Sequence, residues 1–212
     1  MQVIKKLLII SDSMLRFQGK AGSRLGSGHF CSVHAFGGAL CSEITGNILD
    51  ICEKTTKGYY DRVIVMAGTN NMSKQGVSGL YVYREMIKLL TALAKLGGTI
   101  ILIGLLPRGF CQCSKSEKCR NIHKSSKKKN SVMPWEVNKE ACRVNDCLFD
   151  SITHDVRFSD RFHFVDLFKF VLKQGSYHDN YDGVLRYDGL HLSIKGNEIL
   201  DRKLGELFEN MK

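Results

Sequence analysis

Short runs of apolar residues recur along the chain, and each ends at a glycine, a proline or a polar residue. A strand whose two faces are both covered carries such an uninterrupted run, which is typical of parallel sheets. The pattern predicts five strands, the last turning helical towards its end, in residues 3–10, 31–38, 61–71, 99–107 and 162–170.

Between these runs, apolar residues return at the spacing of a helix, with polar residues on the other side. The spacing predicts helices at 42–58, 79–98, 136–155 and 193–212. Strands that alternate with helices form a parallel sheet covered on both faces. The expected fold class is therefore α/β, with a five-stranded parallel sheet.

The composition fits one domain. Of 212 residues, 43% are hydrophobic and 25% are charged, which is typical of a globular protein. We predict a single domain over 1–212, with a basic, cysteine-containing insertion at about 108–134. No apolar run approaches the ~20 residues that span a bilayer, and the first residues lack a signal-peptide cleavage site. We expect an intracellular, cytoplasmic protein with no membrane span, and nothing in the sequence indicates its oligomeric state.

Small and polar residues follow the predicted strands, at positions where a ligand would bind. In open parallel sheets, ligands bind outside the carboxyl ends of the strands. The first strand ends in Ser-Asp-Ser, with Ser13 at the turn, and the second ends near Gly38. The third ends near Asn70, while Asp188 and His191 lie three residues apart near the C-terminus.

These residues form a set suited to ester hydrolysis. The Ser13 hydroxyl is a weak nucleophile until a base takes its proton, and His191 is the candidate base. Asp188 would hold the His191 imidazole in the required tautomer. The oxyanion that develops on the substrate needs fixed donors. The backbone N–H groups of Ser13 and Gly38 and the side-chain amide of Asn70 would supply them.

Four blocks, SDSML, FGGAL, AGTNNM and DGLHLS, resemble in order the blocks that give the SGNH (GDSL-like) hydrolase superfamily its name. The last two are most similar to the catalytic subunits of intracellular platelet-activating-factor acetylhydrolases and to esterase domains of retrotransposons. The resemblance implies a flavodoxin-like fold of three α/β/α layers. It also implies hydrolysis of a small acyl ester, for example an acetyl ester of a lipid, through an acyl-enzyme and without a cofactor.

Two features depart from the family pattern. The first block usually begins with glycine, and Ser11 stands in that place here. We expect this serine to alter the geometry of the turn without removing the chemistry. The insertion at 108–134 is long where many relatives have a short loop. Its position after the fourth strand would place it at the rim of the site, as a lid, a specificity element or a partner surface.

Each candidate residue also has a purely structural interpretation. The two serines and Asp12 of the first block could cap a helix. Gly38 and Asn70 could be ordinary turn and loop residues. Asp188 and His191 could belong to a surface loop. The occurrence of all four blocks in the family's order favours catalysis over these separate explanations.

Much of the net charge of +10 is concentrated in one segment. Its seven basic residues are opposed only by Glu117, and they are Lys115, Lys118, Arg120, Lys124, Lys127, Lys128 and Lys129. Such a run attracts polyanions such as RNA through counterion release, or it is simply a solvated loop. The second functional hypothesis is therefore a nucleic-acid-binding module of the same fold, with weak or no catalysis.

Three cysteines and a histidine lie close together in the same insertion, namely Cys111, Cys113, Cys119 and His123. Three thiolates and one imidazole can hold a structural zinc ion in a tetrahedron. The Cys-x-Cys spacing is shorter than the usual one, so free thiols are the alternative. We expect the other cysteines to be small buried hydrophobic residues.

Overall fold

The computed structural model of the chain describes residues 5–12, 15, 29–72, 78–108, 134–158, 160–171, 184–185 and 191–211. Its strands are β1 Lys5–Ser11, β2 His29–Ala35, β3 Arg62–Met66, β4 Thr99–Ile103 and β5 Phe162–Val165. They form one sheet in the order β2-β1-β3-β4-β5, and every neighbouring pair is parallel. This strand order is that of flavodoxin-like folds. The expected α/β class with a five-stranded parallel sheet is confirmed.

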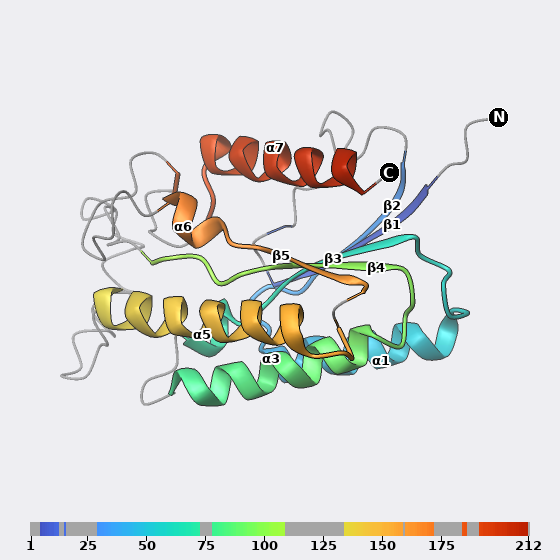
Figure 1. Ribbon diagram of the computed structural model, residues 1–212, viewed down its shortest axis with the longest axis horizontal. Coiled ribbons are helices and arrows are strands. Elements are labelled where there is room, and N and C mark those ends of the chain that lie inside the picture. The colour runs from blue at the N-terminus through green and yellow to red at the C-terminus, as the bar shows by residue number, and fades with distance from the viewer. Residues whose placement is uncertain are drawn as a thin grey trace.

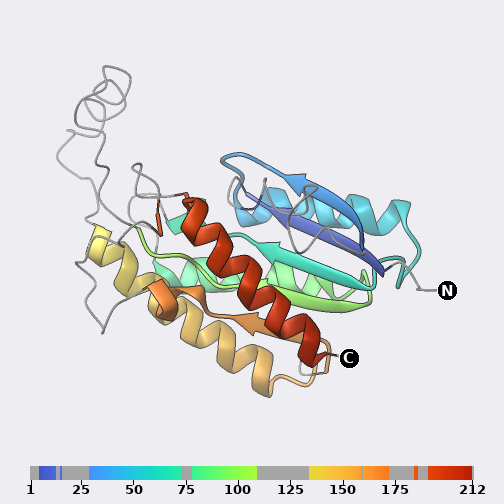
Figure 2. The ribbon, with the colours of Figure 1, turned by 90° about the horizontal axis from the view of Figure 1, so that it is seen from above.

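Helices cover both faces of this sheet. They are α1 Cys41–Lys54, α2 Thr69–Met72, α3 Gly79–Leu93, α5 Pro134–His154, α6 Leu167–Val171 and α7 Ile194–Asn210. Figure 1 shows α1, α3 and α5 on one side of the sheet and α7 on the other, and Figure 2 shows α7 crossing the strands. Among the described residues, no helix combines the length and apolar character needed to cross a membrane.

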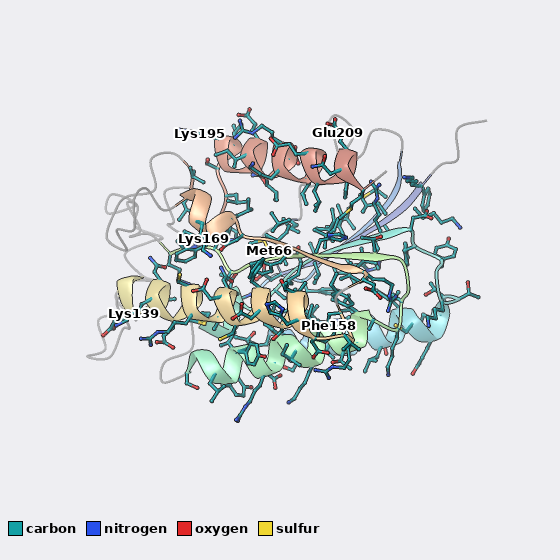
Figure 3. The ribbon with its side chains drawn as sticks, in the orientation of Figure 1. Met66, Lys139, Phe158, Lys169, Lys195 and Glu209 are labelled. Carbon is teal, nitrogen blue, oxygen red and sulfur yellow. The ribbon has the colours of Figure 1, made fainter. Side chains whose placement is uncertain are left out.

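The alternation of side chains along each strand divides the core between the two faces. Leu8 and Ile10 of β1 belong to the buried cluster beneath α1, α3 and α5. Leu7 and Ile9 belong to the cluster beneath α7, together with Met66, which Figure 3 shows within the sheet. All five side chains are fully buried. Burial on both faces explains why the run in β1 is apolar without interruption.

Three of the predicted strands end earlier than their apolar runs suggested, and β3 shows why. Residues 61–71 were predicted as one strand, but β3 ends at Met66, and the short helix α2 follows. Gly68 has a φ of +96°, which a strand does not adopt. A Cβ at this position would lie 2.8 Å from Cδ2 of Leu105. The close approach of the segment after β4 therefore requires glycine here and turns the chain into α2.

The four predicted helices correspond to α1, α3, α5 and α7. All four end before the predicted residue, by the largest margin in α1, which ends at Lys54, and α3, which ends at Leu93. The prediction that 162–170 opens as a strand and turns helical is confirmed by β5 and α6.

Candidate active site

The carboxyl ends of all five strands lie in one row. Ser11 of β1 pairs with Ala35 of β2 and with Met66 of β3. Met66 pairs with Ile103 of β4, which pairs with Val165 of β5. The residues that follow this row therefore meet at one edge of the sheet, which we call the carboxyl edge. Folds of this kind bind their ligands there.

The turn after β1 is held by Ser11. Its buried hydroxyl donates to the carbonyl oxygen of Asp12 at 2.7 Å and accepts from the backbone N–H of Leu15 at 3.2 Å. The carbonyl oxygen of Ser11 accepts from the N–H of Phe36 at 2.8 Å, which ties the turn to the end of β2. Ser11 is thus the last residue of β1, and its hydroxyl stabilises the chain that follows through its bonds to Asp12 and Leu15.

Asn70, one candidate oxyanion donor, is bonded to the loop that carries Gly38, another candidate. Nδ2 of Asn70, in α2, donates a hydrogen bond to the carbonyl oxygen of Ala39 at 3.0 Å. Ala39 directly follows Gly38, so the amide is bonded to the loop that carries the other donor. A primary amide has two N–H groups, and this bond uses one of them. Gly38 is exposed and Asn70 is half-buried, so solvent reaches both.

The neighbours of Asn70 attach α2 to two other segments. Oδ1 of Asn71 accepts from the backbone N–H of Cys41, the first residue of α1, at 2.9 Å. The carbonyl oxygen of Thr69 accepts from Nη2 of Arg108 at 2.9 Å. A helix of four residues has little stability of its own. The orientation of Asn70 therefore depends on these bonds to the surrounding chain.

Two buried asparagines of α5 hold the segment that follows β4. Oδ1 of Asn145 accepts from the N–H of Leu105 at 2.8 Å, and its Nδ2 donates to the carbonyl oxygen of the same residue at 3.0 Å. Asn138 forms the same pair with Arg108, at 2.6 Å and 2.8 Å. Each amide satisfies both backbone groups of its partner, as a neighbouring strand would.

Arg108 brings a positive charge to the carboxyl edge. Burial lowers the pKa of its guanidinium, and the nearby Asp12 acts in the opposite direction. Arginine nevertheless stays charged in proteins. Asp12 is itself buried, and it contributes to a raised pKa of the Cys41 thiol. Burial has the largest effect on that thiol, followed by Glu85 and then Asp12, and the pKa reaches about 12.

His191, the candidate base, directly precedes the segment that starts α7 and is half-buried. The next residue, Leu192, is buried in the same cluster as Leu15, which lies near the end of β1. The Ser193 hydroxyl then caps the first turn of α7. Figure 1 shows that α7 begins at the end of the molecule where the strands finish. The segments that carry His191 and the SDSML block therefore share one part of the core.

The other candidate residues lie outside the described residues, and their roles stay predictions. They are the candidate nucleophile Ser13, its partner Asp188, the basic residues of 115–129, and the proposed zinc ligands Cys111, Cys113, Cys119 and His123. Within the part of the chain that the structure describes, no group of three or more His, Cys, Asp or Glu side chains could hold a metal ion.

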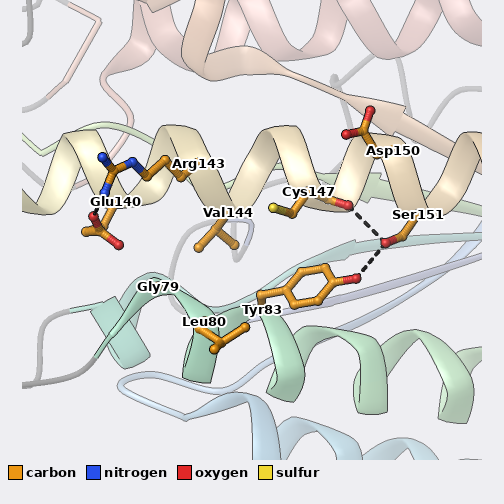
Figure 4. Close-up of a pocket in the computed structure, with 9 residues that line it drawn as sticks. All are labelled: Gly79, Leu80, Tyr83, Glu140, Arg143, Val144, Cys147, Asp150 and Ser151. Carbon is orange, nitrogen blue, oxygen red and sulfur yellow. Dashed lines mark hydrogen bonds and ion pairs between the residues drawn. The ribbon is translucent and has the colours of Figure 1, made fainter.

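A cavity of about 380 Å³ lies between α3 and α5 (Figure 4). It is lined by residues of these two helices. The Tyr83 hydroxyl donates to Oγ of Ser151 at 2.8 Å, and Ser151 donates to the carbonyl oxygen of Cys147 at 2.9 Å. The first of these bonds joins the two helices, and the second lies within α5. The cavity contains none of the candidate catalytic residues.

Four residues that hold the carboxyl edge together were not identified from the sequence, namely Asn71, Arg108, Asn138 and Asn145. A signal existed for the last two, because they lie seven residues apart on the face of α5 that also buries Val144. An amide on an apolar helix face indicates a polar partner inside the protein. Arg108 had no such signal and was taken as the first residue of the insertion.

No protein-family model matches the sequence, and no curated protein sequence matches it. Solved structures do match. A GDSL-like lipase from Bacteroides thetaiotaomicron aligns over 100% of this chain and 93% of its own, with 12% identity and a TM-score of 0.66. A member of the lipolytic G-D-S-L family from Veillonella parvula aligns over 97% and 98%, with 14% identity and a TM-score of 0.64. The chain has the SGNH hydrolase fold.

A Streptococcus pneumoniae protein, described as a candidate platelet activating factor, aligns over 97% of this chain and 84% of its own. Its identity is 20% and its TM-score is 0.63. The SGNH hydrolase fold inferred from the four sequence blocks is thus confirmed. Because one fold hosts many activities, the chemistry has to be argued from the site.

Proposed function

We propose that the protein is a serine esterase. Ser13 is the nucleophile, His191 the general base, and Asp188 the residue that orients the imidazole. The N–H groups of Ser13 and Gly38 and the amide of Asn70 form the oxyanion hole. These roles require the residues to converge at the carboxyl edge of an SGNH hydrolase fold.

One observation carries this proposal. The Asn70 side chain is bonded to the carbonyl oxygen of Ala39, and this bond holds an amide donor beside the Gly38 loop. Fixed donors that converge on one point stabilise an oxyanion, because they need no reorganisation when the charge develops.

The reaction follows from the roles. Oγ of Ser13 attacks the ester carbonyl carbon while His191 takes the hydroxyl proton. The tetrahedral intermediate carries its negative oxygen in the oxyanion hole. It then expels the alcohol, which receives the proton from His191, and leaves an acyl group on Ser13. A water molecule, deprotonated by His191, attacks this acyl-enzyme and releases the carboxylic acid and free Ser13.

A small acyl ester, with acetyl as the first choice, is the proposed substrate. The similarity of the fold to a GDSL-like lipase and to a lipolytic G-D-S-L protein supports the ester class. The proposed nucleophile, base and oxyanion donors are all groups of this chain. The reaction as written therefore needs no cofactor.

The test compares wild type with Ser13→Ala on p-nitrophenyl acetate. We expect the substitution to lower kcat/KM by ~10³-fold or more, since the nucleophile is removed. A fluorophosphonate probe should label wild type at Ser13, as located by mass spectrometry. Ser42→Ala, at an exposed serine on α1, is the matched control and should keep both activity and labelling. A wild type no faster than Ser13→Ala would contradict the proposal.

A further inference from the structure

Arg108 is a half-buried cation that joins the segment after β4 to α2. Its Nη2 donates to the carbonyl oxygen of Thr69 at 2.9 Å. Its own backbone is held at both polar groups by Asn138 of α5. The guanidinium is therefore anchored at its base and bonded at its tip, and the tip bond reaches the peptide group that joins Thr69 to Asn70.

The bond to Thr69 affects the position of Asn70, the proposed oxyanion donor that directly follows it. α2 is four residues long, so its orientation is set by its neighbours. Asn71 attaches one side of it to the start of α1. Arg108 attaches the other side, immediately before Asn70. The bond at Thr69 therefore restrains the peptide group that leads into Asn70.

The charge at Arg108 suits this role. A hydrogen bond from a charged donor is about twice as strong as one between neutral groups. Asp12, which directly follows β1, favours the charged form of the half-buried guanidinium. The Arg108 side chain therefore bonds to the helix that carries Asn70 while its charge is favoured by the carboxylate that directly precedes Ser13.

We propose that Arg108 is a positioning residue for the oxyanion hole, which it serves by holding the Thr69–Asn70 peptide in place. This role rests on the proposed esterase activity. It differs from a general contribution to stability, because it acts on the transition state, in which the Asn70 amide donates to the substrate oxygen that develops negative charge. Loss of Arg108 therefore lowers kcat more than it raises KM.

The test measures p-nitrophenyl acetate hydrolysis by Arg108→Ala and Arg108→Lys. Removal of an oxyanion donor costs ~10²–10³-fold in kcat, so misplacement of one is expected to cost about 30-fold in Arg108→Ala. Arg108→Lys, which keeps the charge but loses the planar fork, is expected to lose about tenfold. KM should stay within about threefold of wild type in both variants. Added guanidinium should restore part of the activity of Arg108→Ala.

Arg161 provides a matched control. Its Nη2 also donates to a backbone carbonyl, that of Ala94, at 3.2 Å, but it lies just before β5, at the opposite end of the strands. Arg161→Ala should keep the kcat of wild type, and guanidinium should not raise its activity. Thermal unfolding of all variants separates a loss of fold from a loss of positioning.

The outcomes divide clearly. A folded Arg108→Ala with unchanged kcat, or one whose loss lies in KM alone and is not rescued by guanidinium, overturns the role of Arg108. If Arg108→Ala does not fold, the split between kcat and KM in Arg108→Lys decides in the same way. A wild type no faster than Ser13→Ala overturns the proposed esterase and this role with it. An active wild type with unaffected Arg108 variants overturns this role only.

Discussion

The two ends of the strands are held together by different means. At the amino ends, the loops are joined mainly through the backbone. The N–H of Asp61 donates to the carbonyl of Lys6, and the N–H of Thr99 donates to the carbonyl of Asp61, both at 2.9 Å. The N–H of Gly58 likewise donates to the carbonyl of Leu96 at 2.7 Å.

At the carboxyl edge, side chains provide much of this bonding. The residues that bind backbone groups there are Ser11, Asn70, Asn71, Arg108, Asn138 and Asn145. Backbone bonds form with almost any sequence, whereas these bonds need particular amides, a hydroxyl and a guanidinium. Substitutions at the amino ends should therefore mainly change stability, whereas substitutions of Asn70 and Arg108 at the carboxyl edge should mainly change activity.

The largest effect is expected at the amino ends, from Gly98→Ala. A Cβ there would lie 2.3 Å from the carbonyl oxygen of Tyr60, and φ is +65°. We expect a loss of ~3 kcal/mol in the free energy of unfolding, measured with urea, because the backbone has to shift. Gly46→Ala, in α1 with nothing within 4 Å of the added Cβ, is the matched control. It should stabilise by ~0.5–1 kcal/mol. Equal stability of Gly98→Ala and Gly46→Ala would contradict the expected cost of a side chain at Gly98.

The second prediction compares substitutions of two adjacent residues at the carboxyl edge, Asn70 and Asn71. Asn70→Ala removes a proposed oxyanion donor, so kcat on p-nitrophenyl acetate should fall by ~10²-fold, while the free energy of unfolding changes by ~1 kcal/mol or less. Asn71→Ala leaves the buried N–H of Cys41 without its side-chain acceptor. This variant should lose ~2 kcal/mol of stability and less than about tenfold in kcat. If Asn71→Ala lost more activity than Asn70→Ala, the assignment of the donor would be wrong.

The smallest effect concerns His163 on β5, between the two ends of the sheet. Burial lowers its pKa in the folded protein. The unfolded chain then binds the proton more readily, so stability is lost as the pH falls through ~6.5. His163→Gln should flatten the dependence of the urea midpoint on pH between about 7.5 and 5.5. An unchanged slope would show that this imidazole keeps its solution environment.

The sequence predicted the sheet and its main helices because both depend on the spacing of apolar residues. It placed the end of β3 too late, since the positive φ at Gly68 and the approach of Leu105 arise from contacts between segments far apart. It also placed Asn70 at the same edge as the Gly38 loop, because parallel strands end at one edge, and the Asn70 amide is bonded to Ala39 of that loop. Arg108 was not identified from the sequence. Its position depends on hydrogen bonds to Asn138, thirty residues away, and no local pattern indicates such bonds.

The clamp between Arg108 and Asn138 also has a consequence for the variability of this protein. The two residues stand on either side of positions 109–133 and are joined by two hydrogen bonds. These two bonds therefore hold the residues on either side of the segment next to each other. Changes in the length of a closed loop cost little free energy, since the closure term grows only slowly with length. Insertions or deletions between these two residues are therefore expected to change the free energy of folding little, as long as both hydrogen bonds between Arg108 and Asn138 are kept.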